Sequence, residues 1–114
     1  MGTAAQKRAG LLKKELNRFI REVPEKIGAE RVLVFGSLAQ NTFHEWSDLD
    51  VVVIAHSTVP FMDRIGQILK QFRPRVGLDL LVYTPEEWDR LVKESSFVKE
   101  EIIKKGKVVY ERPK

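Results

Sequence analysis

The sequence predicts an α/β (α+β) fold in which helices pack on a mixed β-sheet. Apolar runs at 31–35, 48–55 and 78–83 have the length of strands, and strands that are apolar on both faces belong in the middle of a covered sheet. Amphipathic patterns alternate with these runs in the order α, β, β, α, β, α, α, β. With 114 residues, the chain is expected to form one domain, residues 1–114.

The N-terminal segment, about residues 5–27, is expected to be an amphipathic helix. Its apolar side chains recur at three- and four-residue steps among Lys, Arg and Glu, which is typical of a helix that packs on a core. Pro24 lies late in this pattern and should end or kink the helix. The apolar stripe consists of Leu12, Leu16, Phe19 and Val23.

The rest of the chain alternates helix and strand signals. Thr84, Pro85 and Glu87 have the order of an N-cap, a first helical residue and the closing residue of a capping box, so a helix should begin there. The first two strands are too far apart in sequence for a tight hairpin, and their relative direction stays open. The other expected elements are a helix over 60–72, a strand over 78–83, a helix from 95 or 96 to 106 and an edge strand over 107–111.

A polar turn and two acids flank the connection between the first two strands. Gly36 and Ser37 follow the first strand, and Asp48 and Asp50 open the second after ten intervening residues. Gly36 permits a sharp turn, and Ser37 is expected to cap a short helix whose free N–H groups form an anion site. Side chains at i and i+2 of a strand point the same way, so the two carboxylates should converge and share a hard cation such as Mg²⁺. Either feature alone is an ordinary turn or loop, but together they indicate phosphoryl or nucleotidyl transfer.

A third acid, Asp79, lies inside the apolar strand at 78–83. An unpaired carboxylate in such a run is costly to bury, so its presence needs a partner or a function. One interpretation is a partly exposed strand end where Asp79 pairs with Arg73 or Arg75. The other is a third carboxylate of the same site, on a neighbouring strand.

The Gly-Ser pair at 36–37, the ten-residue spacing and Asp-Leu-Asp at 48–50 together resemble the signature of nucleotidyltransferases of the DNA polymerase β superfamily. In length the chain is similar to the minimal nucleotidyltransferases that are often encoded beside a HEPN-domain protein, and the resemblance runs from about residue 28 to 110. It implies the polymerase β palm-like nucleotidyltransferase fold. It also favours Asp79 as the third acid, because the family places its third acid in such a strand.

The resemblance implies a reaction, transfer of AMP from ATP, and a role for each residue of the motif. Asp48 and Asp50 would hold Mg²⁺, and Asp79 would complete the site for a second Mg²⁺ and help to deprotonate the acceptor hydroxyl. Gly36 and Ser37 would hold the β- and γ-phosphates. Many members read Gly-Ser-x-Ala-Arg-Gly, whereas this chain has Gln and Asn at positions 40 and 41. The departure replaces the family arginine, which is expected to contact phosphate, and so predicts a weaker or altered affinity for the nucleotide.

The acceptor is expected to come from a partner, because the motif and its sheet use nearly the whole chain. By resemblance it is a tyrosine hydroxyl of a HEPN toxin, which makes the chain an antitoxin that adenylylates its partner. The alternative is a non-catalytic antitoxin, a binding module that neutralises its partner by stoichiometric contact. Gln40 and Asn41 favour that alternative, and the three acids oppose it.

Composition excludes several other classes of function. The net charge of +4 and the pI of about 9.5 are compatible with nucleic acid, but the basic residues alternate with Glu, so a salt-bridged surface explains them better and nucleic acid is not favoured. No cysteine is present, which excludes disulfides and thiolate chemistry and fits a cytoplasmic protein. The longest apolar run has five residues, 51–55, so no membrane helix is expected.

Three ring side chains lie in the connection before the acids. Phe43 and Trp46 are of a kind on which a nucleobase can stack, but aromatic residues in such a loop more often anchor it to the core, and we expect anchoring here. His44 is expected to be a surface residue rather than a base or a ligand.

Overall fold

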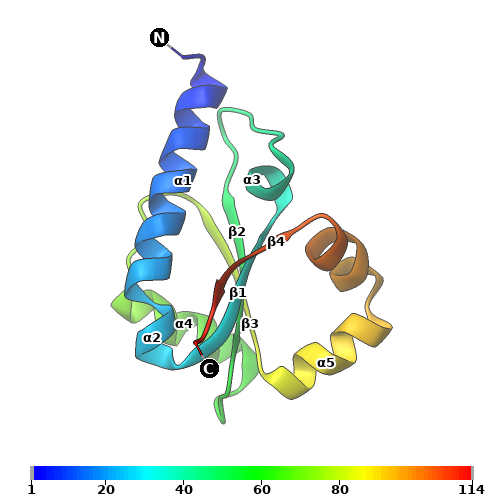
Figure 1. Ribbon diagram of the computed structural model, residues 1–114. Coiled ribbons are helices and arrows are strands. Elements are labelled where there is room, and N and C mark those ends of the chain that lie inside the picture. The colour runs from blue at the N-terminus through cyan, green and yellow to red at the C-terminus, as the bar shows by residue number, and fades with distance from the viewer. Residues whose placement is uncertain (1, 114) are drawn as a thin grey trace.

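A computed structural model describes residues 2–113, which contain one four-stranded mixed sheet with helices on both of its faces (Figure 1). This arrangement confirms the α/β (α+β) class and the mixed sheet. The spatial order of the strands is β3-β2-β1-β4. Their bounds are Ala29–Phe35 for β1, Leu49–Ala55 for β2, Leu78–Tyr83 for β3 and Lys107–Glu111 for β4.

Six helical segments connect and flank these strands within residues 2–113. The expected first helix is divided at Pro24 into α1 and α2, because proline lacks the N–H that would continue the helix. Before α5, the Thr84 side chain accepts from the Glu87 N–H and the Glu87 side chain accepts from the Thr84 N–H, which confirms the capping box. The bounds are Ala4–Glu22 for α1, Pro24–Ile27 for α2, Gly36–Gln40 for α3, Phe61–Gln71 for α4, Pro85–Glu94 for α5 and Val98–Lys104 for the π-helix η1.

Two local expectations are corrected. Ser37 does not cap α3: the helix starts directly after β1, its N-cap is Phe35 without a side-chain bond, and Ser37 already lies in the first turn. Asp48 lies immediately before β2 rather than inside it, so only Asp50 has the orientation that a strand imposes.

The strand directions bring three chain segments to one end of the sheet. β1 is antiparallel to β2 and to β4, whereas β2 is parallel to β3. The end of β1 therefore lies beside the beginnings of β2 and β3. These are the segments that carry Gly36, Asp50 and Asp79.

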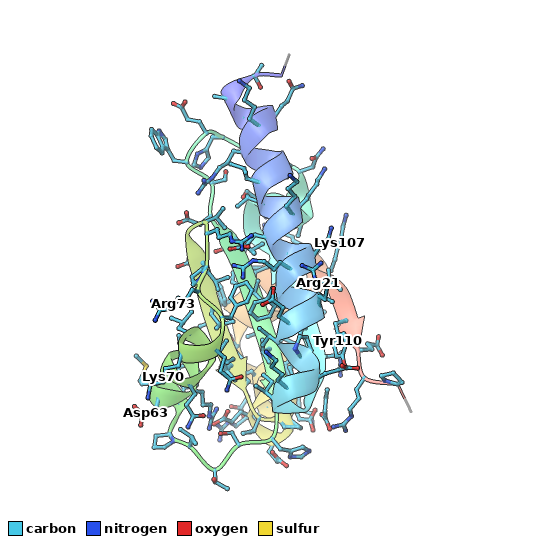
Figure 2. All side chains as sticks on the ribbon, turned by 90° about the vertical axis from the view of Figure 1, so that its left-hand side faces the viewer. Arg21, Asp63, Lys70, Arg73, Lys107 and Tyr110 are labelled. Atoms are coloured by element: carbon cyan, nitrogen blue, oxygen red, sulfur yellow. The ribbon has the colours of Figure 1, made fainter. Side chains whose placement is uncertain are left out.

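Each face of the sheet has its own apolar core. On one face β1, β2 and β3 pack against α1 and α4, and on the other they pack against α5 and η1. Figure 2 views the first face, with α1 in front, Lys107 and Tyr110 of β4 on one side of it and Lys70 and Arg73 on the other. The largest buried side chains of the first core are Phe19, Phe72, Leu12 and Leu49, and the second core includes Trp88, Ile102, Ile54 and Val98.

Within residues 2–113, no helix combines the length and the apolar character that crossing a membrane requires.

Candidate active site

A row of three side chains crosses the sheet where β1 ends and where β2 and β3 begin. Phe35 pairs in register with Asp50, and Asp50 pairs with Asp79. Residues paired in this way point to the same face, and their chain neighbours 34, 51 and 80 belong to the core on the α1–α4 face. The row therefore faces the α5–η1 side, where the half-exposed Phe97 packs edge-on against Phe35 with ring centroids 5.9 Å apart.

Asp50 is the most perturbed acid of this row. Partial burial, a hydrogen bond with Asp79, and the charges of Asp79 and Asp48 raise the pKa of Asp50 from its ordinary 3.8 to about 7. Each of these causes disfavours a second negative charge at this position. A bound cation would remove the repulsion, which is the electrostatic signature of a cation or proton site.

Asp48 lies next to this pair but faces another way. Its side chain is 49% exposed, and its Oδ1 atom lies 3.8 Å from Nη2 of Arg8 in α1. Gly77, which precedes β3, lies so close that a Cβ there would be 2.1 Å from the same oxygen. The structure thus brings Asp50 and Asp79 into contact and leaves Asp48 beside them, between Arg8 and Gly77.

The turn from β1 into α3 closes against Asp50. Gly36 has a φ of 67°, and a Cβ at this position would lie 2.1 Å from Oδ2 of Asp50, so both the backbone and the space require glycine. The first N–H groups of α3, including that of Ser37, have no acceptor inside the helix. Backbone donors therefore begin directly beside the carboxylate of Asp50. At the other end of α3, Asn41 adopts a φ of 59°. Glycine is the commonest residue in this left-handed conformation at a helix end, and Asn also tolerates it.

The donor set fits a hard divalent cation, although the three acids are not drawn together. Within residues 2–113, no three His, Cys, Asp or Glu side chains are gathered closely enough to share one metal ion. The adjacent oxygens of Asp50 and Asp79 are nevertheless the ligand type that Mg²⁺ prefers. Gly36 and Gly77 leave space directly against Asp50 and Asp48, where any other residue would place a Cβ. The half-exposed Asp48 would have to move toward the pair to share a metal ion with it.

The loop before Asp48 separates its aromatic residues. Phe43 packs against the first core, with Nζ of Lys13 5.9 Å from its ring centroid, which confirms it as an anchor. Trp46 is 77% exposed, so the expectation that it anchors the loop is wrong. His44 is exposed, and its Nδ1 atom accepts from the N–H of Trp46, which makes it part of the turn.

Two residues next to the acids were not anticipated from the sequence. In the sequence Gly77 has only the character of a turn residue, and its closeness to Asp48 follows from the β2–β3 register, which begins one residue later with Leu49 opposite Leu78. Arg8 lies forty positions before Asp48, and no local pattern connects them. The structural alternative for Asp79 is met in one part only: Asp79 is exposed near the start of β3, but no ion pair within residues 2–113 joins it to Arg73 or Arg75.

One hollow of the surface lies away from the acids. A cavity of about 470 Å³ lies at the opposite end of β2, and its lining includes Ala55, His56, Gln67 and Lys70 but none of the three acids. Size alone would favour this end of the molecule. The chemistry favours the other end, because the three acids, the glycine that closes against Asp50 and the raised pKa of Asp50 are all there.

Several solved structures resemble the chain at low sequence identity. The chain resembles a protein of Sulfolobus solfataricus described as a nucleotidyltransferase, with 21% identity, a TM-score of 0.70 and coverage of 98% of this chain and 91% of that one. Two toxin–antitoxin structures, one with AMP-PNP and one a mutant of MntA–HpeT, are 19% and 18% identical and cover 89% of this chain and 73% of theirs. Their TM-scores, 0.49 and 0.48, are too low to support inference.

The search of curated proteins found no match. The likeness to the Sulfolobus protein concerns the fold alone, which agrees with the fold that the sequence motif implied. The family model described as "Nucleotidyltransferase domain" matches residues 16–113, which include Gly36, Ser37 and all three acids. By this match over most of its length, the chain belongs to the nucleotidyltransferase domain family.

Proposed function

We propose that the chain is a Mg²⁺-dependent nucleotidyltransferase that transfers AMP from ATP to a protein hydroxyl. The observation that carries the proposal is the contact between Asp50 and Asp79 on neighbouring strands, at the end of the sheet where Gly36 turns against Asp50. Paired acids beside a turn of free backbone donors suit a phosphate chain and its counter-ion. Family membership supports the reaction class.

We propose one role for each residue of the site. Asp50 and Asp79, joined by Asp48, would hold the Mg²⁺ ions, and bound Mg²⁺ would supply charge neutralisation for the phosphates. Gly36 and the N–H of Ser37 would contact the β- and γ-phosphates. The acceptor oxygen would form a bond to the α-phosphorus, the bond from that phosphorus to the β-phosphate bridge would break, and pyrophosphate would leave. Asp79, the exposed member of the pair, would help to accept the hydroxyl proton.

The acceptor is proposed to be a tyrosine of a HEPN toxin, with this chain as its antitoxin. This part of the proposal rests on the sequence resemblance to minimal nucleotidyltransferases. The site itself supports an external acceptor, because Asp79 and Asp48 are both exposed and a second polypeptide can approach them.

One observation favours the rival, a non-catalytic antitoxin. Asp48 lies beside Arg8, and the three acids do not form a ready metal group within residues 2–113. If that arrangement persists in the presence of Mg²⁺ and ATP, the chain would neutralise its partner by contact alone.

Intact-mass spectrometry separates the two. The chain is incubated with ATP, Mg²⁺ and a candidate HEPN partner from a neighbouring reading frame, and the expected result is a partner heavier by one or more AMP groups. Asp79→Asn should keep the complex, measured by size-exclusion chromatography, but lose the added mass. Complex formation without any mass gain in the wild type would establish the rival.

A further inference from the structure

Arg8 is held at the rim of the candidate site by the segment that carries Asp48. Its Nε atom donates to the carbonyl oxygen of Ser47 at 2.7 Å, and its Nη2 atom lies 3.8 Å from Oδ1 of Asp48. Figure 1 shows the first turns of α1 beside the loop between α3 and β2, where this contact lies. Helix α1, which lies outside the sheet, therefore places a guanidinium beside Asp48.

The acceptor that holds Arg8 is itself fixed. Ser47 is buried, its N–H donates to the carbonyl oxygen of His44 at 3.1 Å, and its Oγ accepts from the N–H of His44 at 2.9 Å. A carbonyl in such a closed turn keeps its direction, so the guanidinium is oriented by its Nε bond. Little side-chain freedom would then be lost when a ligand engages the other end of the fork.

The hydrogen bonds of Arg8 distinguish it from the two well-buried arginines. Arg18 donates through Nε and Nη2, and Arg64 donates through Nε and both Nη atoms, in each case to carboxylate and carbonyl oxygens. Arg8 donates only through Nε among residues 2–113, although a guanidinium has five N–H donors. No buried side-chain nitrogen lacks a partner in that part of the chain, so the unused donors of Arg8 reach solvent.

We propose that Arg8 is a phosphate-binding residue of this site, which contacts the triphosphate of the donor nucleotide through its free Nη donors. The inference rests on the proposed function. A cation held by Asp48 would share the carboxylate that Arg8 already approaches, so phosphate oxygens bound to that cation would come within reach of the guanidinium. Arg forms paired, charge-assisted hydrogen bonds with phosphate oxygens, and its positive charge offsets part of the charge of the acids.

Calorimetry on four versions of the full chain tests this: wild type, Arg8→Gln, Arg8→Lys and Lys7→Gln. Lys7 precedes Arg8 on α1, is exposed and forms no ion pair within residues 2–113, so Lys7→Gln removes the same charge without the contact. The probes are Mg²⁺–ATP, Mg²⁺–tripolyphosphate, which lacks base and sugar, and Mn²⁺ alone. Melting temperatures check that each variant folds.

Arg8→Gln should weaken both triphosphate probes by about tenfold or more, since a hydrogen bond to a charged group is lost, while Lys7→Gln stays near wild type. Arg8→Lys should fall between, because it keeps the charge but not the fork. Binding of Mn²⁺ alone should be no weaker in Arg8→Gln than in wild type.

Other results overturn the inference. Equal triphosphate affinity in Arg8→Gln and Lys7→Gln would leave only a general charge effect. Loss of Mn²⁺ binding in Arg8→Gln would mean that Arg8 merely positions Asp48. A wild type that binds neither triphosphate probe would instead contradict the proposed function itself, and the inference with it.

Discussion

Single residues at the site are constrained by contacts that leave no room for a side chain. Gly36 closes against Asp50 and Gly77 against Asp48, so each of these two acids has a glycine as its immediate neighbour. At Gly36 the backbone adds a second constraint, since its φ of 67° is costly for any residue with a Cβ. The turn from β1 into α3 and the position of Asp50 are therefore one structural unit.

Gly36→Ala tests whether the backbone and the space at Gly36 matter for Mn²⁺ binding as well as for stability. We expect the unfolding free energy to fall by about 1–2 kcal/mol because of the left-handed backbone. We also expect Mn²⁺ affinity to fall below that of wild type, because the new Cβ displaces Asp50. Gly66→Ala is the matched control: nothing lies within 4 Å of its added Cβ in helix α4, so stability should rise slightly and Mn²⁺ binding should not change. Urea denaturation and calorimetry measure the two effects, and unchanged Mn²⁺ affinity in Gly36→Ala would disconnect the turn from the metal site.

The raised pKa of Asp50 predicts an unusual pH dependence of stability in the presence of a chelator. Its pKa is about 7 in the folded chain and ordinary in the unfolded chain, so the folded state binds more protons between these values. Stability contributed by this group is thus present at low pH and is lost as the pH rises through 7. Asp50→Asn, which mimics the protonated form, should stabilise the protein more at about pH 8 than at about pH 5.

Asp89→Asn on the exposed side of α5 provides the comparison. Its effect should stay within about 0.5 kcal/mol at both pH values, as is usual for surface substitutions. An Asp50→Asn variant that behaves in the same way would show that the pKa of Asp50 is not raised.

Among the secondary-structure elements, α1 depends on a buried ion pair as well as on its apolar stripe. The carboxylate of Glu15 is 3% exposed, accepts from Arg18 Nε at 2.7 Å and Nη2 at 3.0 Å, and also accepts from the backbone N–H of Arg75. Burial alone would raise the pKa of Glu15, but the hydrogen bonds from Arg18 and Arg75 outweigh it and hold the pKa below its ordinary value. This carboxylate ties α1 to the segment that leads through Gly77 into β3.

Glu15→Ala should therefore cost about 2 kcal/mol or more, because it leaves a guanidinium and a backbone N–H without their acceptor. Glu22→Ala removes the other carboxylate near Arg18, but that pair is 3.7 Å apart with Glu22 39% exposed, so about 0.5 kcal/mol or less is expected. Denaturant titration of both variants compares them directly. Equal losses would mean that the bond to Arg75 contributes nothing to the docking of α1.

The elements also show where sequence reasoning succeeded and where it could not. Some features are local and can be predicted from neighbouring residues. They are the three apolar segments that form strands, the break at Pro24, and the capping box of Thr84 and Glu87. The contact of Arg8 with Asp48 and the closure of Gly77 on Asp48 depend on strand order and direction, which no local pattern encodes. The same limit applies to Trp46, because hydrophobicity cannot show whether a loop indole faces the core or the solvent.

For the molecule as a whole, the site places mutually repelling carboxylates at the edge of two well-packed cores. Burial of Asp50 and the nearby charges of Asp79 and Asp48 raise the pKa of Asp50, so this group of acids opposes folding unless a cation or a proton relieves it. The apolar cores on the two faces of the sheet stabilise the fold and offset this repulsion. Such a site is expected to trade stability for ligand binding.

The double variant Asp48→Asn with Asp50→Asn tests that trade at the scale of global unfolding. In wild type, Mg²⁺ or Mn²⁺ at millimolar concentration should raise the melting temperature, since a ligand that binds only the folded state stabilises it by mass action. The double variant should melt higher than wild type in chelator, because the repulsion is gone, and should not respond to the metal. Asp63→Asn with Asp89→Asn, which removes the same formal charge from exposed positions on α4 and α5, should keep the metal response. If wild type in metal melts no higher than wild type in chelator, the carboxylates at this end of the sheet do not form a competent metal site.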